Sequence, residues 1–177
     1  MIKAMTEAAP FGPDARTQLL DLYDEALPQV YGYLVRRCAS TTVAEDITGE
    51  TFLAALDACA RGTGTRPTVP WLITVSRNKL VDHWRRQARE ERNVRLVAVS
   101  EEPDEDAWPD MLDEARVLAT LGTLGPHHQA ALTLRYLDRL PVPQVADHLG
   151  RSVHATEALL MRAKAAFRKN YPGGTGA

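Results

Sequence analysis

Cysteine is scarce in this sequence, and no catalytic motif is found in it. The two cysteines, Cys38 and Cys59, form neither a CxxC pair nor a Cys/His set, so we expect two buried small hydrophobic side chains rather than a zinc site or a disulfide. The five histidines show no ligand spacing among themselves. A phosphate loop, a nucleophile elbow and a metal-carboxylate cluster are missing as well. We therefore expect a protein that is not an enzyme and binds no cofactor.

Long hydrophobic runs are also missing. No stretch approaches the roughly 18 apolar residues of a membrane span, and the opening MIKAMTEAAPFGPD lacks the apolar core of a signal peptide. Hydrophobic residues still make up 45% of the 177 residues, which is enough to form the core of one ordinary domain or of two small helical ones. We therefore expect a cytoplasmic protein without membrane insertion.

Charge is nearly balanced overall but strongly segregated along the chain. The formal net charge is −2, yet cations minus acids give −5 for residues 1–60, +4 for 71–95, −7 for 100–116 and +4 for 151–169. Two basic segments separated by an acidic one indicate two nucleic-acid contact surfaces on two modules joined by a linker.

The sequence pattern is helical throughout. No stretch shows sustained polar/apolar alternation with β-branched residues, and Pro and Gly separate the segments. The sequence therefore predicts an all-α fold of two small helical domains, residues 15–92 and 111–170, joined by an acidic linker over residues 93–110. The predicted helices cover residues 15–37, 42–60, 71–89, 111–121, 126–137, 142–149 and 153–169.

Two local signals concern the first helices. Pro28 lies inside the first predicted helix and is expected to bend or split it. Thr42 and Glu45 have the spacing of a capping box, in which each side chain bonds an orphan backbone amide, so Thr42 is expected to open the second helix.

The segment 142–169 has the pattern of a helix-turn-helix. A short helix is followed by a turn at Gly150, and Ser152 is placed to cap a longer helix. The predicted buried stripe of that helix comprises Val153, Thr156, Leu160, Ala163 and Phe167. The opposite face carries Ala155, Ala158, Arg162 and Lys169. Small residues allow close approach to base edges and cations meet phosphates, as a recognition helix requires. A helical hairpin with a solvated basic face is the alternative.

The predicted helix 71–89 also has two different faces. Its apolar side is defined by Ile73, Leu80 and Trp84. The opposite side carries Trp71, Asn78, Asp82, Arg85 and Arg89. An aromatic ring, an amide and cations together can stack a base, bond its edge and neutralise phosphates, which single-strand recognition needs. A merely solvated helix face is the alternative.

Three blocks in a fixed order carry a family resemblance. AEDITGETFLAAL (44–56) resembles the core-binding helix of region 2 in extracytoplasmic-function (group IV) sigma factors of RNA polymerase, and WLITVSRNKLVDHWRR (71–86) resembles their promoter −10 helix. The segment 118–168, which includes RYLDRLPVPQVADHLGRSVHATEALLMRAKAAFR, is similar to their region 4. The chain is therefore identified as resembling a subunit that directs core RNA polymerase to promoters and assists melting.

The resemblance implies partners and site residues. The partners are core polymerase (its beta and beta-prime subunits), promoter DNA as duplex and as melted nontemplate strand, and an anti-sigma factor. The polymerase-binding positions are Asp46, Glu50, Phe52 and Leu53. The −10 contacts are Arg66, Trp71, Asn78, Asp82, Arg85, Arg86 and Arg89. The −35 contacts are Arg151, Ser152, His154, Ala155, Ala158, Arg162 and Lys169. The linker resembles the segment that passes through the RNA exit path.

The sequence departs from the family pattern at several of these places. Gly49 stands where the family usually has Gln, and Pro141 replaces the usual Ser or Thr before the first helix of the turn motif. Ala155, Thr156 and Glu157 stand where Thr, Val and Lys are common, which puts the −35 sequence preference in doubt. A stand-alone helix-turn-helix regulator and a helical protein–protein adaptor remain the alternative functions.

Overall fold

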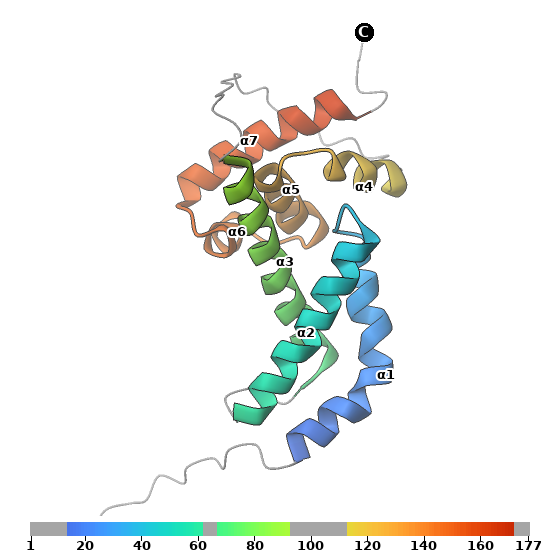
Figure 1. Cartoon of the computed structure of the whole chain (residues 1–177). Coiled ribbons are helices and arrows are strands. Elements are labelled where there is room, and N and C mark those ends of the chain that lie inside the picture. Colours follow the sequence, from blue (N-terminus) through green and yellow to red (C-terminus); the bar gives the residue numbers. More distant parts are fainter. Residues whose placement is uncertain (1–13, 62–66, 93–112, 172–177) are drawn as a thin grey trace, which may run out of the picture.

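The structure of the chain is a computed structural model that describes residues 14–61, 67–92 and 113–171, and every regular element in these ranges is helical (Figure 1). The elements are α1 Asp14–Val35, α2 Thr41–Arg61, α3 Val69–Arg92, α4 Glu114–Gly122, α5 Pro126–Leu132, the π-helical turn η1 Thr133–Leu137, α6 Val142–Leu149 and α7 Val153–Asn170. The predicted all-α fold is confirmed. The predicted linker, residues 93–110, lies outside the described residues.

The N-terminal module consists of α1, α2 and α3, which pack on one another around a shared core. Its fully buried side chains include Val30, Leu34, Ala44, Ala55, Leu72 and Leu80. Two threonines in α2 are buried without leaving a polar atom unsatisfied, because the hydroxyls of Thr48 and Thr51 each donate to the carbonyl four residues earlier, at 2.7 Å. The buried faces are thus mostly apolar, and the buried hydroxyl groups of α2 are satisfied within the helix.

The ends of these helices differ slightly from the sequence predictions. Pro28 lies inside α1 without splitting it, and α1 is one continuous helix. Helix α2 begins at Thr41, and the Ala44 amide bonds the Ser40 carbonyl at 3.1 Å. Thr42 therefore lies within the first turn and does not cap the helix as predicted.

The C-terminal module consists of α4 to α7, and its turn motif forms as predicted. Gly150 adopts a left-handed conformation with φ 62° at the end of α6, which glycine tolerates without a steric cost. The Ser152 hydroxyl then accepts a hydrogen bond from the Ala155 amide at 3.2 Å and caps α7. Helices α6 and α7 meet at this turn (Figure 1).

The predicted helix 126–137 forms in two parts. Helix α5 ends at Leu132, and the wider turn η1 continues to Leu137. At its end the Asp138 amide bonds the Thr133 carbonyl five residues back, at 3.0 Å. Such π-helical turns often occur at functional positions, and this one places Asp138 at the surface of the C-terminal module that faces the N-terminal module.

The buried side of α7 is rotated from the predicted stripe. Thr156, Leu160, Ala163 and Phe167 are buried as expected, but Val153 is 43% exposed and Leu159 is buried instead. The reason is that α7 packs on both α4 and α5, and Leu159 joins the same apolar cluster as Val117 and Leu121 of α4.

The two modules pack directly against each other. Helix α3 contacts α5 and α6, and Ala130, Leu134 and Val145 of the C-terminal module belong to the same buried cluster as the core of α1 to α3. Figure 1 shows α3 running from the N-terminal module up to the helices of the C-terminal module. The sequence predicts two modules and a linker but gives no indication of this shared core.

Candidate nucleic-acid and polymerase interfaces

The outer face of α3 forms a cluster of cations. Four basic side chains and two acidic ones line a shallow polar depression, and we call this group the α3 cation cluster: Lys79, Arg85, Arg86, Arg89, Asp82 and Glu50. The Glu50 carboxylate lies 3.6 Å from Lys79 Nζ and 3.9 Å from Arg86 Nη2. These are half-exposed pairs that each contribute little to stability. The excess positive charge suits a polyanion.

Glu50 therefore has a different environment from the one expected. It was predicted to face the polymerase together with Asp46, but its side chain turns toward α3 and pairs with cations predicted to contact DNA. Asp46 is exposed one turn earlier on α2. The two acids still lie one turn apart on α2, and both act against the lowering of the His83 pKa, but the ion pairs with cations of α3 involve Glu50.

The remaining predicted −10 residues fall into three environments. Asn78 is exposed in the middle of α3. Trp71 is half-buried against the core of the N-terminal module, and its backbone amide donates to the Thr68 hydroxyl at 3.3 Å. Arg66 lies outside the described residues. Asn78 is accordingly an exposed hydrogen-bonding group on this helix, whereas much of the Trp71 ring is engaged in packing.

Arg85 is engaged by the C-terminal module. Its guanidinium Nη2 donates to the backbone carbonyl of His148, near the end of α6. The same nitrogen lies 3.2 Å from the position that a Cβ would take on Gly150. Arg85 was predicted as a DNA contact, and in this arrangement its tip is directed to the helix-turn-helix.

An apolar groove runs between α1 and α2. It has a volume of about 530 Å³, and its lining consists of Tyr23, Leu27, Pro28, Tyr31, Glu45, Thr48, Gly49 and Phe52. We call it the α1–α2 groove. Leu20 and Leu53 beside it are 66% and 65% exposed, and Tyr23 is 40% exposed. Exposed large apolar side chains in one area are characteristic of a protein–protein contact.

Two predicted polymerase-binding residues occupy different positions at this groove. Leu53 projects to solvent, whereas Phe52 is buried and packs against the Tyr23 ring with centroids 4.9 Å apart. Sequence reasoning missed Leu20 and Tyr23. Their spacing of three residues on one helix was a usable signal, since it puts two large apolar side chains on the same face.

The outward face of α7 stays accessible. Ser152, His154, Arg162 and Lys169 are exposed, and Arg151, Ala155 and Ala158 are half-exposed. The Arg162 side chain lies back along the helix, with Nε donating to the Ala158 carbonyl at 3.2 Å. All seven predicted −35 residues are therefore at least partly exposed to solvent.

A buried ionic cluster joins the modules, and no signal in the sequence pointed to it. The Asp138 side chain is 2% exposed. Its Oδ1 accepts from Arg37 Nε at 3.0 Å and Nη2 at 2.8 Å, and its Oδ2 accepts from Arg77 Nε at 3.0 Å and the Tyr33 hydroxyl at 2.9 Å. Burial, followed by the Asp138 charge, raises the pKa of Tyr33 well above its ordinary value, so this hydroxyl remains a donor.

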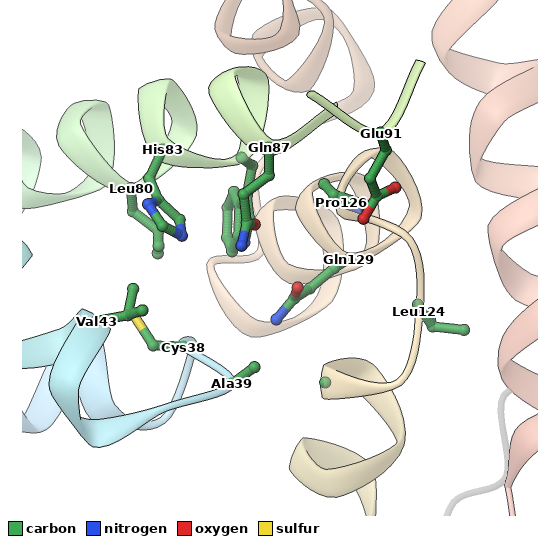
Figure 2. Close-up of a pocket in the computed structure, with 12 residues that line it drawn as sticks. Cys38, Ala39, Val43, Leu80, His83, Gln87, Glu91, Leu124, Pro126 and Gln129 are labelled. Atoms are coloured by element: carbon green, nitrogen blue, oxygen red, sulfur yellow. The ribbon is translucent and has the colours of Figure 1, made fainter. Parts of the chain in front are cut away.

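A small cavity lies beside this cluster, between the modules. It has a volume of about 150 Å³, and Figure 2 shows Cys38 and Ala39 on one side with Leu124, Pro126 and Gln129 on the other. Cys59 is buried as expected, but Cys38 is only half-buried here. Burial raises the pKa of the Cys38 thiol to about 11, so it stays protonated at neutral pH.

Two further observations describe the chemistry of the molecule. Among the described residues, no group of three or more His, Cys, Asp or Glu side chains is placed to hold a metal ion. No helix in the described part of the chain is long and apolar enough to cross a membrane.

Both modules match known families. Residues 22–90 match the family model for Sigma-70 region 2, and residues 114–167 match that for Sigma-70, region 4. The ECF RNA polymerase sigma factor SigL of Mycobacterium tuberculosis is 32% identical over 152 residues, which cover 83% of this chain and 85% of the relative. The ECF RNA polymerase sigma factor BldN of Streptomyces coelicolor is 34% identical over 149 residues, which cover 80% of this chain but only 56% of BldN.

A solved structure has a similar fold. The sigma factor RpoE of Bartonella quintana, determined in complex with the anti-sigma factor NepR, aligns with a TM-score of 0.50 at 17% sequence identity. The alignment covers 85% of this chain and 94% of that one. At this identity the likeness concerns the arrangement of the helices.

Proposed function

Because the chain belongs to the extracytoplasmic-function sigma factors, the subunits that direct RNA polymerase to promoters, we propose that three of its exposed surfaces divide this task. The α1–α2 groove binds core polymerase, the α3 cation cluster with Asn78 binds the −10 element, and the outward face of α7 binds the −35 element. The observation that carries the proposal is the presence of these three surfaces, each of suitable chemistry, within the two matched modules.

The polymerase contact is assigned to the rim of the α1–α2 groove. Leu20, Tyr23 and Leu53 supply exposed apolar area, and the exposed Asp46 supplies a charge for a basic partner. Burial of one leucine side chain contributes about 1.5–3 kcal/mol, so the apolar rim outweighs an exposed ion pair. Glu50 has a smaller part in this contact than its spacing implied, because it is paired with α3.

The two DNA contacts use different chemistry. On α3, Arg86 and Arg89 are exposed cations for the phosphates of the nontemplate strand, and Asn78 supplies donors and an acceptor for an unpaired base. On α7, the first turn with His154 and Ala155 lies where helix-turn-helix proteins read base edges, and Arg162 lies two turns further along, where phosphate is the expected partner.

The domain limits and one partner remain part of the proposal. We assign residues 15–92 to polymerase and −10 binding, residues 111–170 to −35 binding, and the acidic residues 93–110 to the linker between them. An anti-sigma partner is proposed from the family resemblance. A pull-down with the full chain, using as candidates the proteins encoded by neighbouring genes, tests whether the chain binds an anti-sigma partner.

A binding assay with purified core polymerase tests the groove. Leu53→Asp in the full chain should weaken core binding at least about tenfold, because it places a charge in a contact that buries apolar area. Met161→Asp is the matched control, since Met161 is 45% exposed but lies on α7. Equal affinity of both variants and the unaltered protein, with unchanged helical content, would contradict the assignment.

A further inference from the structure

We propose that Gly49 is a specificity-determining residue of the α1–α2 groove. The missing side chain at this position leaves open space that accepts one large apolar side chain from a basic segment of core polymerase. The inference rests on the proposed function, which assigns the groove to polymerase. It adds which residue of the groove selects the partner and which chemistry the partner carries.

Nothing inside the protein requires a glycine at this position. Gly49 lies well inside α2, where glycine lowers helix stability relative to alanine. Among the described glycines, Gly150 is the one with a positive φ, so the backbone of Gly49 has a conformation that other residues adopt freely. Crowding is not the reason either, because a Cβ built on Gly49 meets nothing within 4 Å. The reason for a glycine is therefore to be sought in a contact with a partner.

A second residue that is unfavourable in helices lines the same groove. Pro28 is exposed inside α1 and removes one N–H group from the hydrogen bonds of that helix. Proline and glycine are the two least favourable residues in a helix interior, and one of each lines the groove from two helices that lie side by side (Figure 1). Natural chains depart from local preferences mainly at functional sites. The shape of the groove accounts for both residues better than helix stability does.

The open space suits an apolar side chain. The groove volume of about 530 Å³ is many times the about 30 Å³ of one water molecule. The rings of Tyr23 and Phe52 line the groove with their centroids 4.9 Å apart, and the Thr48 hydroxyl already donates to the Ala44 carbonyl. An inserted leucine or phenylalanine would bury apolar area, whereas a polar side chain would lose water without gaining bonds. A glutamine at position 49, the usual family residue, would occupy this space from within.

The charges at the groove select a basic partner. Glu45 lines the groove and Asp46 is exposed beside it on α2, and the described residues that line the groove include no cation. Acids at this position repel the phosphates of DNA. A second copy of the chain would bring the same acids against each other. The occupant that fits is therefore a polymerase segment in which an apolar side chain is flanked by Lys or Arg.

The test is core-polymerase binding by the full chain with side chains of increasing size at position 49. Gly49→Ala should weaken binding roughly threefold and Gly49→Gln roughly tenfold, because each fills more of the space that the partner needs. Both variants should also raise the melting temperature, since alanine and glutamine are better helix formers than glycine. Stability and binding should thus change in opposite directions.

Gly32→Ala and Gly32→Gln are the matched controls. Gly32 also lies inside a helix, α1, and a Cβ there meets nothing within 4 Å, but it does not line the groove. These two variants should raise the melting temperature as well and leave the affinity for core polymerase unchanged.

A second pair of variants tests the charge of the partner. Glu45→Gln should weaken core binding severalfold at low salt and less at high salt, as expected for an exposed charge facing a cation. Glu25→Gln makes the same change at an exposed position of α1 outside the groove and should have no effect. Equal affinity of these two variants would contradict the basic character of the partner.

Unchanged or tighter core binding by Gly49→Gln would overturn the proposal, because a side chain at position 49 would then assist the contact. Equal losses for the Gly49 and Gly32 variants would also overturn it, since a change in the helices rather than in the groove would be the cause. Leu53→Asp separates these failures from failure of the proposed function. If Leu53→Asp weakens core binding and Gly49→Gln does not, only the role of Gly49 is wrong. If neither weakens it, the groove does not bind polymerase and both proposals fail.

Discussion

Among single residues, Asn78 distinguishes a base-binding role from a structural one. It is exposed on α3, so truncation should cost little folding stability. Asn78→Ala should impair open-complex formation more than initial promoter binding, because an unpaired base becomes available only after melting. Affinity of the polymerase complex for duplex and for premelted promoters is the measurement. An equal loss on both would indicate that Asn78 supports the fold of α3 instead.

The sequence predicts helix caps and buried positions well where one face of a helix packs against one neighbouring element. Ser152, Gly150 and the buried positions Thr156, Leu160 and Ala163 follow from capping rules and helical spacing. Val153 does not, because α7 packs against three helices, α4, α5 and α6, and its buried side faces between them. Asp46 and Glu50 lie one turn apart on α2 as their spacing predicts, but that spacing cannot show that Glu50 pairs with Lys79 and Arg86 of α3.

At the scale of helices, Gly49 is a position where α2 can be stabilised. A Cβ built on Gly49 meets nothing within 4 Å, so Gly49→Ala should gain about 1 kcal/mol of helix propensity. For a chain of this size that raises the melting temperature by about 2–4 °C. Thermal unfolding followed by circular dichroism is the measurement.

Gly150→Ala serves as the opposing control for this prediction. Gly150 has φ 62° and a Cβ there would lie 3.2 Å from Arg85 Nη2, so alanine should lower the melting temperature. A lower melting temperature for Gly49→Ala would contradict the prediction. It would show that the added methyl group disturbs the packing of α2.

Three half-buried histidines predict how stability changes with pH. Burial lowers the pKa of His83, His128 and His148 below 6.5, and nearby Arg86, Arg162 and Arg77 respectively add to the effect. The unfolded chain therefore binds more protons than the folded one as pH falls through 6.5. Stability should be fully present above that pH and decline below it.

The measurement is the melting temperature at about pH 7.5 and about pH 5.5, a range in which few carboxylates titrate. We expect a lower value at the acidic pH, and a smaller difference for His128→Gln than for a change at the exposed His154. A melting temperature that is equal or higher at the acidic pH would contradict the effect of burial.

For the molecule as a whole, contacts between distant segments are what the sequence could not supply. Helix positions and the order of the modules follow from local periodicity and from the family resemblance. Asp138 meets Tyr33 and Arg37 across more than 100 residues, and no local pattern encodes such a pairing. The same limitation applies to Arg85. Its positive charge is evident from the sequence, but its hydrogen bond to the His148 carbonyl of α6 is not.

Run-off transcription with purified core RNA polymerase and genomic DNA fragments tests the central claim most directly. With the full chain added, we expect discrete transcripts from a small set of start sites that core polymerase alone does not use. Asn78→Ala should reduce these transcripts on duplex templates. Binding of the chain to duplex DNA without any new start site in the presence of core polymerase would contradict the account.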